Sequence, residues 1–95
     1  MINWSVYIIT NKLKGVLYIG VTKDLKRRIY QHKKKAHPAT FSARYNLNKL
    51  VYFENFEQEE KAYVKEKQIK KWNRDWKIKL IEEENPNWED LYEKL

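Results

Sequence analysis

Two segments rich in β-branched and aromatic residues lie close together near the N-terminus, and they constrain the fold more than any other feature. The compositions of residues 3–9 and 16–21 are typical of β-strands. Residues 10–15 between them are polar and end on Gly15, a pattern typical of a hairpin loop. We therefore expect the chain to begin with two antiparallel strands joined by a short loop.

A helix is expected directly after the hairpin. Thr22 can cap it, and the i, i+4 spacing of Leu25 and Ile29 predicts its buried side. The helical pattern continues to about Lys35. Residues 37–48 fit a loop with a short helix.

The second half of the chain predicts one more strand and several helices. Residues 50–56 are typical of a strand, whereas residues 57–73 contain no Gly or Pro and predict the longest helix. Two further helical segments are expected at 74–83 and 88–95, separated by Asn85-Pro86. The order β-β-α-β-α predicts an α+β fold, in which a small three-stranded antiparallel sheet is flanked by helices.

The chain has 95 residues, which fits a single domain. We expect its core at about residues 2–80 and a short helical C-terminal extension at 81–95. No apolar stretch approaches the roughly 20 residues needed to cross a bilayer, and the N-terminus does not resemble a signal peptide. A cytoplasmic protein that does not enter membranes is therefore expected.

Composition narrows the possible sites. The absence of cysteine excludes a disulfide framework, and two histidines argue against structural zinc. Residues 1–50 hold 11 Lys/Arg and one acid, while residues 51–95 hold 9 Lys/Arg and 12 acids. A basic half predicts a surface that meets a polyanion, nucleic acid first. A lysine-rich soluble protein without such a partner would explain the charge equally well.

The hairpin places aromatic residues on one face. If Thr10 pairs with Gly15, Tyr7 lies opposite Tyr18 and both point to the same side of the sheet. An ordinary cross-strand aromatic pair is the simpler explanation from the hairpin alone. Gly20 shares that face, and a glycine inside a strand often marks the close approach of another group.

The first helix adds charged residues beside this face. Arg28 and His32 are spaced i, i+4 next to the stripe of Leu25 and Ile29, so they project in one direction. The neighbouring cations fit a solvated basic face that at most contacts phosphate. These cations are Lys23, Lys26, Arg27, Lys33, Lys34 and Lys35.

The long helix supplies an acid in an unusual position. Ala62, Glu66 and Ile69 are spaced i, i+4 and i+7, so Glu66 interrupts an apolar stripe. A half-buried carboxylate is costly unless it is paired or binds a metal. Pairing of Glu66 with Arg28 is the structural alternative to a functional role.

Together these residues resemble the GIY-YIG nucleases. The resemblance rests on Tyr7, on Tyr18-Ile19-Gly20 eleven residues later, on Arg28 and His32, and on a helical glutamate downstream. It covers nearly the whole chain. The chain looks most like the small stand-alone bacterial members, which are similar to the amino-terminal domain of the excision-repair endonuclease. Ser5 stands where the first motif has glycine, a substitution the family tolerates.

The resemblance implies an active site and a reaction. Tyr7 and Tyr18 would correspond to the two motif tyrosines, one of which helps to orient or deprotonate the attacking water. Arg28 would stabilise the charge that develops on the phosphate, and His32 would assist in proton transfer or in holding the phosphate. Glu66 would hold one divalent ion, Mg²⁺ or Mn²⁺. The residues expected to contact nucleic acid are Gly20, Lys23, Arg27, Lys33, Lys34 and Lys35. Asn85 would match a further polar residue found in some members.

The expected function is thus a metal-dependent DNA endonuclease acting in repair or recombination, with RNA as another possible substrate. Related nucleases usually carry a second domain that chooses the target, and 95 residues leave no room for one. Specificity would then come from a protein partner or from oligomerisation, or it would be low. The alternative is a catalytically silent nucleic-acid-binding module with the same fold. Glu66 favours the nuclease, since a binder has no need of a carboxylate that repels phosphate. A protein-interaction domain using the acidic C-terminal third rests on charge alone.

Overall fold

Three antiparallel strands form the centre of the molecule. The computed structural model describes residues 3–35 and 44–95, so most of the expected loop and short helix at 37–48 lies outside the described residues. The strands are β1 (Trp4–Thr10), β2 (Leu17–Thr22) and β3 (Lys49–Phe56), in the order β2-β1-β3. The predicted α+β fold is confirmed, and β2 and β3 are the edge strands.

The register of the hairpin differs from the prediction. Thr10 pairs with Leu17, so Tyr7 lies opposite Gly20 and Ile9 lies opposite Tyr18. The loop is longer than expected because Asn11 accepts a hydrogen bond from the Val16 N–H at 3.1 Å, which holds Val16 inside the loop. The shift is an even number of residues, so Tyr7 and Tyr18 still share a face, now as diagonal neighbours.

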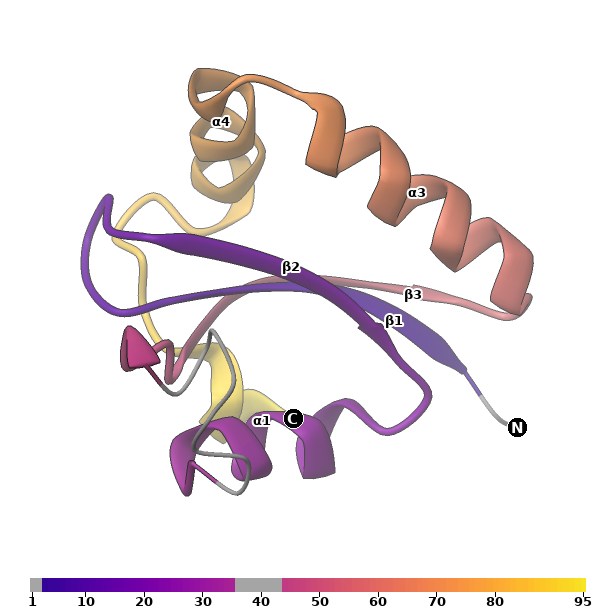
Figure 1. The fold of residues 1–95 in the computed structure, drawn as a ribbon, viewed down its shortest axis with the longest axis horizontal. Helices are drawn as coiled ribbons and strands as arrows, with labels where there is room; N and C mark the ends of the chain where they lie inside the picture. The colour runs from indigo at the N-terminus through magenta and orange to yellow at the C-terminus, as the bar shows by residue number, and fades with distance from the viewer. Residues whose placement is uncertain (1–2, 36–43) are drawn as a thin grey trace.

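Helices cover both faces of the sheet (Figure 1). On one face lie α3 (Glu59–Lys71) and α4 (Arg74–Glu84). On the other lie α1 (Leu25–Lys33) and the C-terminal segment, which ends in the 3₁₀ helix η1 (Leu91–Lys94). The three predicted long helical segments are therefore present, and the last short helix is a 3₁₀ turn that begins three residues later than expected.

The cap of α1 is Asp24, whereas Thr22 was predicted. The Asp24 side chain accepts from the Arg27 N–H at 3.2 Å, which satisfies a free amide of the first turn. The Thr22 hydroxyl instead accepts from the Asp24 N–H at 3.1 Å and fixes the turn before the helix. Two polar side chains thus set the direction in which α1 leaves β2.

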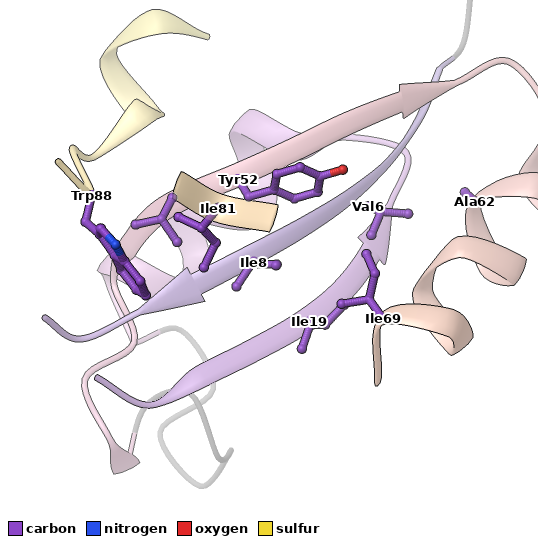
Figure 2. Packing of buried hydrophobic residues seen from close by; sticks show 9 residues of the cluster. Val6, Ile8, Ile19, Tyr52, Ala62, Ile69, Ile81 and Trp88 are labelled. Atoms are coloured by element: carbon purple, nitrogen blue, oxygen red, sulfur yellow. The ribbon is translucent and has the colours of Figure 1, made fainter. Parts of the chain in front are cut away.

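The face under α3 and α4 is closed by apolar side chains (Figure 2). Ile8 and Ile19 from the sheet contact a layer that includes Ala62, Ile69 and Ile81, all fully buried or nearly so. Residues spaced along α3 therefore present one apolar stripe to β1 and β2, as predicted for Ala62 and Ile69.

The face under α1 has a smaller core. Ile29 of α1 is fully buried against Ile9 and Leu50, and Leu25 packs beside them. Tyr7 is also part of this cluster, with 1% of its surface exposed.

Within residues 3–35 and 44–95, no helix has the length and apolar character needed to span a membrane.

Candidate active site

Three rings meet on the face of the sheet that α1 covers. The Tyr7 and Tyr18 ring centroids are 6.5 Å apart, and the His32 ring lies 5.9 Å from Tyr7 and 6.0 Å from Tyr18. The Tyr7 hydroxyl and His32 Nε2 form a hydrogen bond of 3.2 Å. The structure therefore brings Tyr7, Tyr18 and His32 together as predicted, despite the different register.

Gly20 is required by the position of Tyr7. A Cβ atom on Gly20 would lie 2.6 Å from both Cζ and the hydroxyl oxygen of Tyr7. Gly20 is buried, and the group that approaches it closely is the tyrosine ring of the neighbouring strand. The position of Gly20 indicates that it makes room for Tyr7, and its contact with nucleic acid stays a prediction.

Tyr7 is held in its protonated form. The pKa of Tyr7 is raised to about 12, chiefly by burial and also by the nearby Tyr18 and Glu66, while the Arg28 guanidinium acts in the opposite direction. A tyrosine with this pKa carries its proton at neutral pH. It can donate a hydrogen bond to His32, but it is poorly suited to remove a proton from water.

Arg28 and His32 leave α1 on the same side, as their i, i+4 spacing requires. Arg28 is exposed, and its guanidinium lies near enough to the Tyr7 hydroxyl to lower its pKa. His32 and Tyr18 are half-buried, so both also reach the surface. The arrangement offers a cation and two partly accessible polar rings above one buried tyrosine.

Glu66 comes from the opposite side of the sheet. It belongs to α3, whose stripe residues Ala62 and Ile69 pack under the other face. Its side chain is only 14% exposed. Its charge nevertheless raises the pKa of Tyr7, which places the carboxylate within electrostatic reach of the ring cluster. The helix that carries Glu66 packs on both β1 and the edge strand β2, the two strands that carry Tyr7 and Tyr18.

The expected alternative, an ion pair between Glu66 and Arg28, is not observed in the described residues. In the described part of the chain Glu66 forms no ion pair with Arg28; its partner is Lys70, whose Nζ lies 3.4 Å from Oε2. Lys70 is i+4 from Glu66 and about half exposed, so this pair is a weak surface contact that can open.

The residues around Glu66 could hold a divalent ion only if waters and substrate supply most of its ligands. Within residues 3–35 and 44–95, no group of three or more His, Asp or Glu side chains could surround a metal. Glu66 offers one half-buried carboxylate. Mg²⁺ is commonly held by one or two carboxylates while waters and substrate phosphate oxygens complete its shell. The residues present fit a cation of that type and do not fit a cage made of protein ligands alone.

The predicted nucleic-acid-binding cations differ in their surroundings. Lys23, Arg27, Lys34 and Lys35 are exposed around α1. Lys33 instead donates to the Asn48 carbonyl oxygen at 2.8 Å, pairs with Asp90 and lies 5.1 Å from the Tyr92 ring. Its charge is therefore used within the fold.

Asp90 was missed by the sequence analysis. Its carboxylate pairs with Lys33 and accepts from the backbone N–H groups of Leu50 at 3.2 Å and Tyr92 at 3.1 Å. An aspartate before a short helix indicates a cap, and Asp90 does cap η1. Nothing in the sequence pairs it with Lys33, 57 residues earlier. This contact ties the C-terminal segment to the residue next to His32.

The hydrogen bonds of Asn85 join backbone groups and do not involve the rings of Tyr7, Tyr18 and His32. It is buried, and its amide donates to the carbonyl oxygens of Val51 at 3.1 Å and Glu89 at 2.9 Å. Its oxygen accepts from the Glu89 N–H at 3.0 Å. These backbone contacts hold the end of α4 and the following turn against β3.

The fold and the tyrosine–histidine–arginine arrangement define a class of protein. A model of the GIY-YIG catalytic domain matches residues 3–79. The chain belongs to the GIY-YIG family, as its motif spacing predicted.

Within this family the chain is similar to small bacterial proteins of the UPF0213 group. It is 40% identical to a UPF0213 protein of Clostridium perfringens over 93 residues, covering 94% of this chain and 92% of the relative. A UPF0213 protein of Staphylococcus saprophyticus is 36% identical over 78 residues, covering 82% and 93%. The solution NMR structure of a UPF0213 protein from Bacillus halodurans has a TM-score of 0.58 and 28% identity, covering 93% and 92%.

Proposed function

We propose that this protein is a divalent-metal-dependent endonuclease that hydrolyses phosphodiester bonds of DNA. The observation that carries the proposal is the hydrogen bond between Tyr7 and His32 beside the Tyr18 ring, with Arg28 exposed on the same helix. An ordinary cross-strand aromatic pair does not require an imidazole and a guanidinium next to it. Membership of the GIY-YIG family supports a nucleic acid as substrate.

The two tyrosines take different roles in this proposal. Tyr7 is buried and protonated, so it orients His32 through its hydroxyl. Tyr18 is half-buried and reaches the surface, so it is the tyrosine that can hold the attacking water. His32 takes part in removing the proton from that water, because imidazole is the side chain that exchanges protons near neutral pH.

The charge that develops on the phosphate needs positive groups. Arg28 presents a planar fork of donors that matches two phosphate oxygens. Glu66 is the residue that would hold Mg²⁺ or Mn²⁺, together with waters and substrate oxygens. When bound, such an ion polarises the phosphate and stabilises the leaving oxygen.

The test is a cleavage assay on supercoiled plasmid, branched DNA and RNA, with Mg²⁺, Mn²⁺ or a chelator. Wild-type protein is expected to cut only with metal. Arg28→Ala and Glu66→Gln should each lower the rate by about 100- to 1,000-fold, since each removes a group that stabilises transition-state charge.

Two matched variants control for charge alone. Lys61→Ala removes an exposed cation from α3, and Glu60→Gln removes an exposed carboxylate from the same helix. Both should cut at the wild-type rate. Should the wild type cut no faster than Arg28→Ala and Glu66→Gln, the nuclease proposal fails. Binding of DNA without any cutting would then favour the silent binding module.

A further inference from the structure

A groove at the junction of α3 and α4 lies outside the ring cluster. Its volume is about 400 Å³, and it is lined by Trp72, Trp76, Lys79, Leu80 and Glu83. On α4, positions 76, 79/80 and 83 recur at the spacing of one helical face. This face therefore combines aromatic surface with one cation and one acid.

Two indole rings form the aromatic part of the groove. Their centroids are 5.9 Å apart in an edge-to-face arrangement, and 58% of Trp76 is exposed. The Trp76 N–H of the backbone is used in the Asn73 cap, but that contact does not involve the ring. An exposed indole of this size offers a flat face on which another planar group can stack.

Cations outnumber acids around the groove. Residues 65–84, which include all of its lining residues, contain seven Lys/Arg against five acids, although the second half of the chain as a whole is acidic. The Lys65 ammonium lies 5.7 Å from the Trp72 ring, and Lys79 lines the groove. Glu83 is the acid among the lining residues. This charge is complementary to a polyanion and would repel a basic peptide.

The groove also has a defined relation to the proposed active site. Glu66 lies on α3, and Trp72 directly follows the end of this helix six residues later, a separation of about 9 Å along a helix axis. Arg74 anchors the first turn of α4 to the β1–β2 loop, where it donates to the carbonyl oxygens of Lys14 and Gly15. The loop leads into the strand that carries Tyr18. The contact of Arg74 thus connects the start of α4 to the loop before β2.

We propose that this groove binds an unstacked base of single-stranded nucleic acid. The base stacks on Trp76, and Lys79 and Lys65 contact its flanking phosphates. Stacking on an aromatic face is tolerant of sequence because every base has a π-face. The inference rests on the proposed function, because it names the form of the substrate: a nucleic acid with an unpaired segment next to the bond that is cut.

The experiment measures binding of labelled oligothymidine and oligouridine, of roughly fifteen nucleotides, by fluorescence anisotropy in chelator. Trp76→Ala should weaken binding by about 5- to 100-fold, the loss expected for one stacked base. Trp76→Phe should retain most of the affinity. Lys79→Ala should lower the slope of log affinity against log salt by about 0.7. The DNA and RNA arms show which sugar is preferred.

Tyr63→Ala is the matched control, because Tyr63 is also an exposed aromatic residue of α3 but does not line the groove. It should bind like the wild type. Equal binding by wild type and Trp76→Ala overturns the inference. Binding of a polypeptide at the groove without binding of either oligonucleotide also overturns it.

The two proposals can fail separately. If Trp76→Ala binds oligonucleotide more weakly but the wild-type protein cuts no substrate, the endonuclease proposal fails and the groove is still a nucleic-acid-binding site.

Discussion

Tyr7 and Tyr52 are buried tyrosines on opposite faces of the same sheet, and they show how the two faces differ. The Tyr52 hydroxyl donates to Glu54 at 2.8 Å, a partner two residues away on its own strand. The Tyr7 hydroxyl meets His32, which belongs to a different element. Burial raises the pKa of both hydroxyls, so both stay protonated at neutral pH.

The contrast between Tyr7 and Tyr52 indicates which face of the sheet accommodates interacting polar side chains. The face under α3 and α4 is closed by apolar side chains, both aliphatic and aromatic. The face under α1 has a smaller apolar cluster, and its Tyr7 and Tyr18 rings meet His32 at the margin. We infer that the first face mainly holds the sheet rigid, apart from Glu66 of α3, while the second positions Tyr7, Tyr18 and His32.

The largest effect on stability is expected from Gly20→Ala. The added methyl group would lie 2.6 Å from the Tyr7 ring, so the ring must move. Overpacking of this kind costs about 1–3 kcal/mol of unfolding free energy. A displaced Tyr7 loses its contact with His32, and misplacement by about 1 Å can lower a reaction rate about 100-fold. Urea denaturation and the plasmid assay measure the two effects.

A double-mutant cycle identifies the cause. On a Tyr7→Ala background the ring is absent, so Gly20→Ala should cost little further stability. If Gly20→Ala costs the same with and without the ring, close approach of Tyr7 is not the reason for glycine at this position.

A smaller effect is expected when the two tyrosines are compared directly. Tyr7→Phe and Tyr52→Phe each remove one hydroxyl and should each cost about 1 kcal/mol of stability. Only Tyr7→Phe should slow cleavage, by about 10- to 100-fold, because only its hydroxyl orients His32. Rates at saturating DNA concentration measure this. Equal rates for the two variants would remove the functional distinction between the faces.

Local patterns were sufficient to predict most of the fold. The strands, the long helix and the stripe of Ala62 and Ile69 follow from composition and periodicity within short windows. The hairpin register did not, because one side-chain hydrogen bond from Val16 to Asn11 decided the loop length. The predicted cap of α1 was wrong by two residues because Thr22 and Asp24 are both good capping residues, and composition alone does not choose between them.

The sequence indicated which residues form the candidate site, but it did not indicate how all of them are placed around the sheet. Spacing on α1 placed Arg28 and His32 on one side, and strand alternation placed Tyr7 with Tyr18. That Glu66 belongs to the opposite face could not be derived, because helical periodicity does not tell which side of a sheet a helix covers. The Lys33–Asp90 contact joins distant segments, which single-sequence patterns do not encode.

An effect on stability alone is expected from this contact between Lys33 and Asp90, which holds the C-terminal segment to α1. Partial burial tends to raise the pKa of Asp90, but hydrogen bonds from Lys33 and from the N–H groups of Tyr92 and Leu50 lower it below its usual value. The folded state therefore binds a proton less readily than the unfolded chain. Asp90 contributes stability above its unfolded pKa of about 4, and that contribution is lost as the pH falls through its lower folded pKa.

Asp90→Asn should accordingly cost about 1–2 kcal/mol near neutral pH, the range for hydrogen bonds to a charged group. The difference from wild type should shrink in urea titrations below about pH 4, where the wild-type carboxylate is also protonated. Glu82→Gln is the matched control on the other face: Glu82 accepts from Trp88 Nε1 at 2.7 Å, and glutamine keeps an acceptor there. A stability difference for Asp90→Asn that does not change with pH would show that the ion pair does not hold the C-terminal segment, and that backbone contacts such as those of Asn85 do so instead.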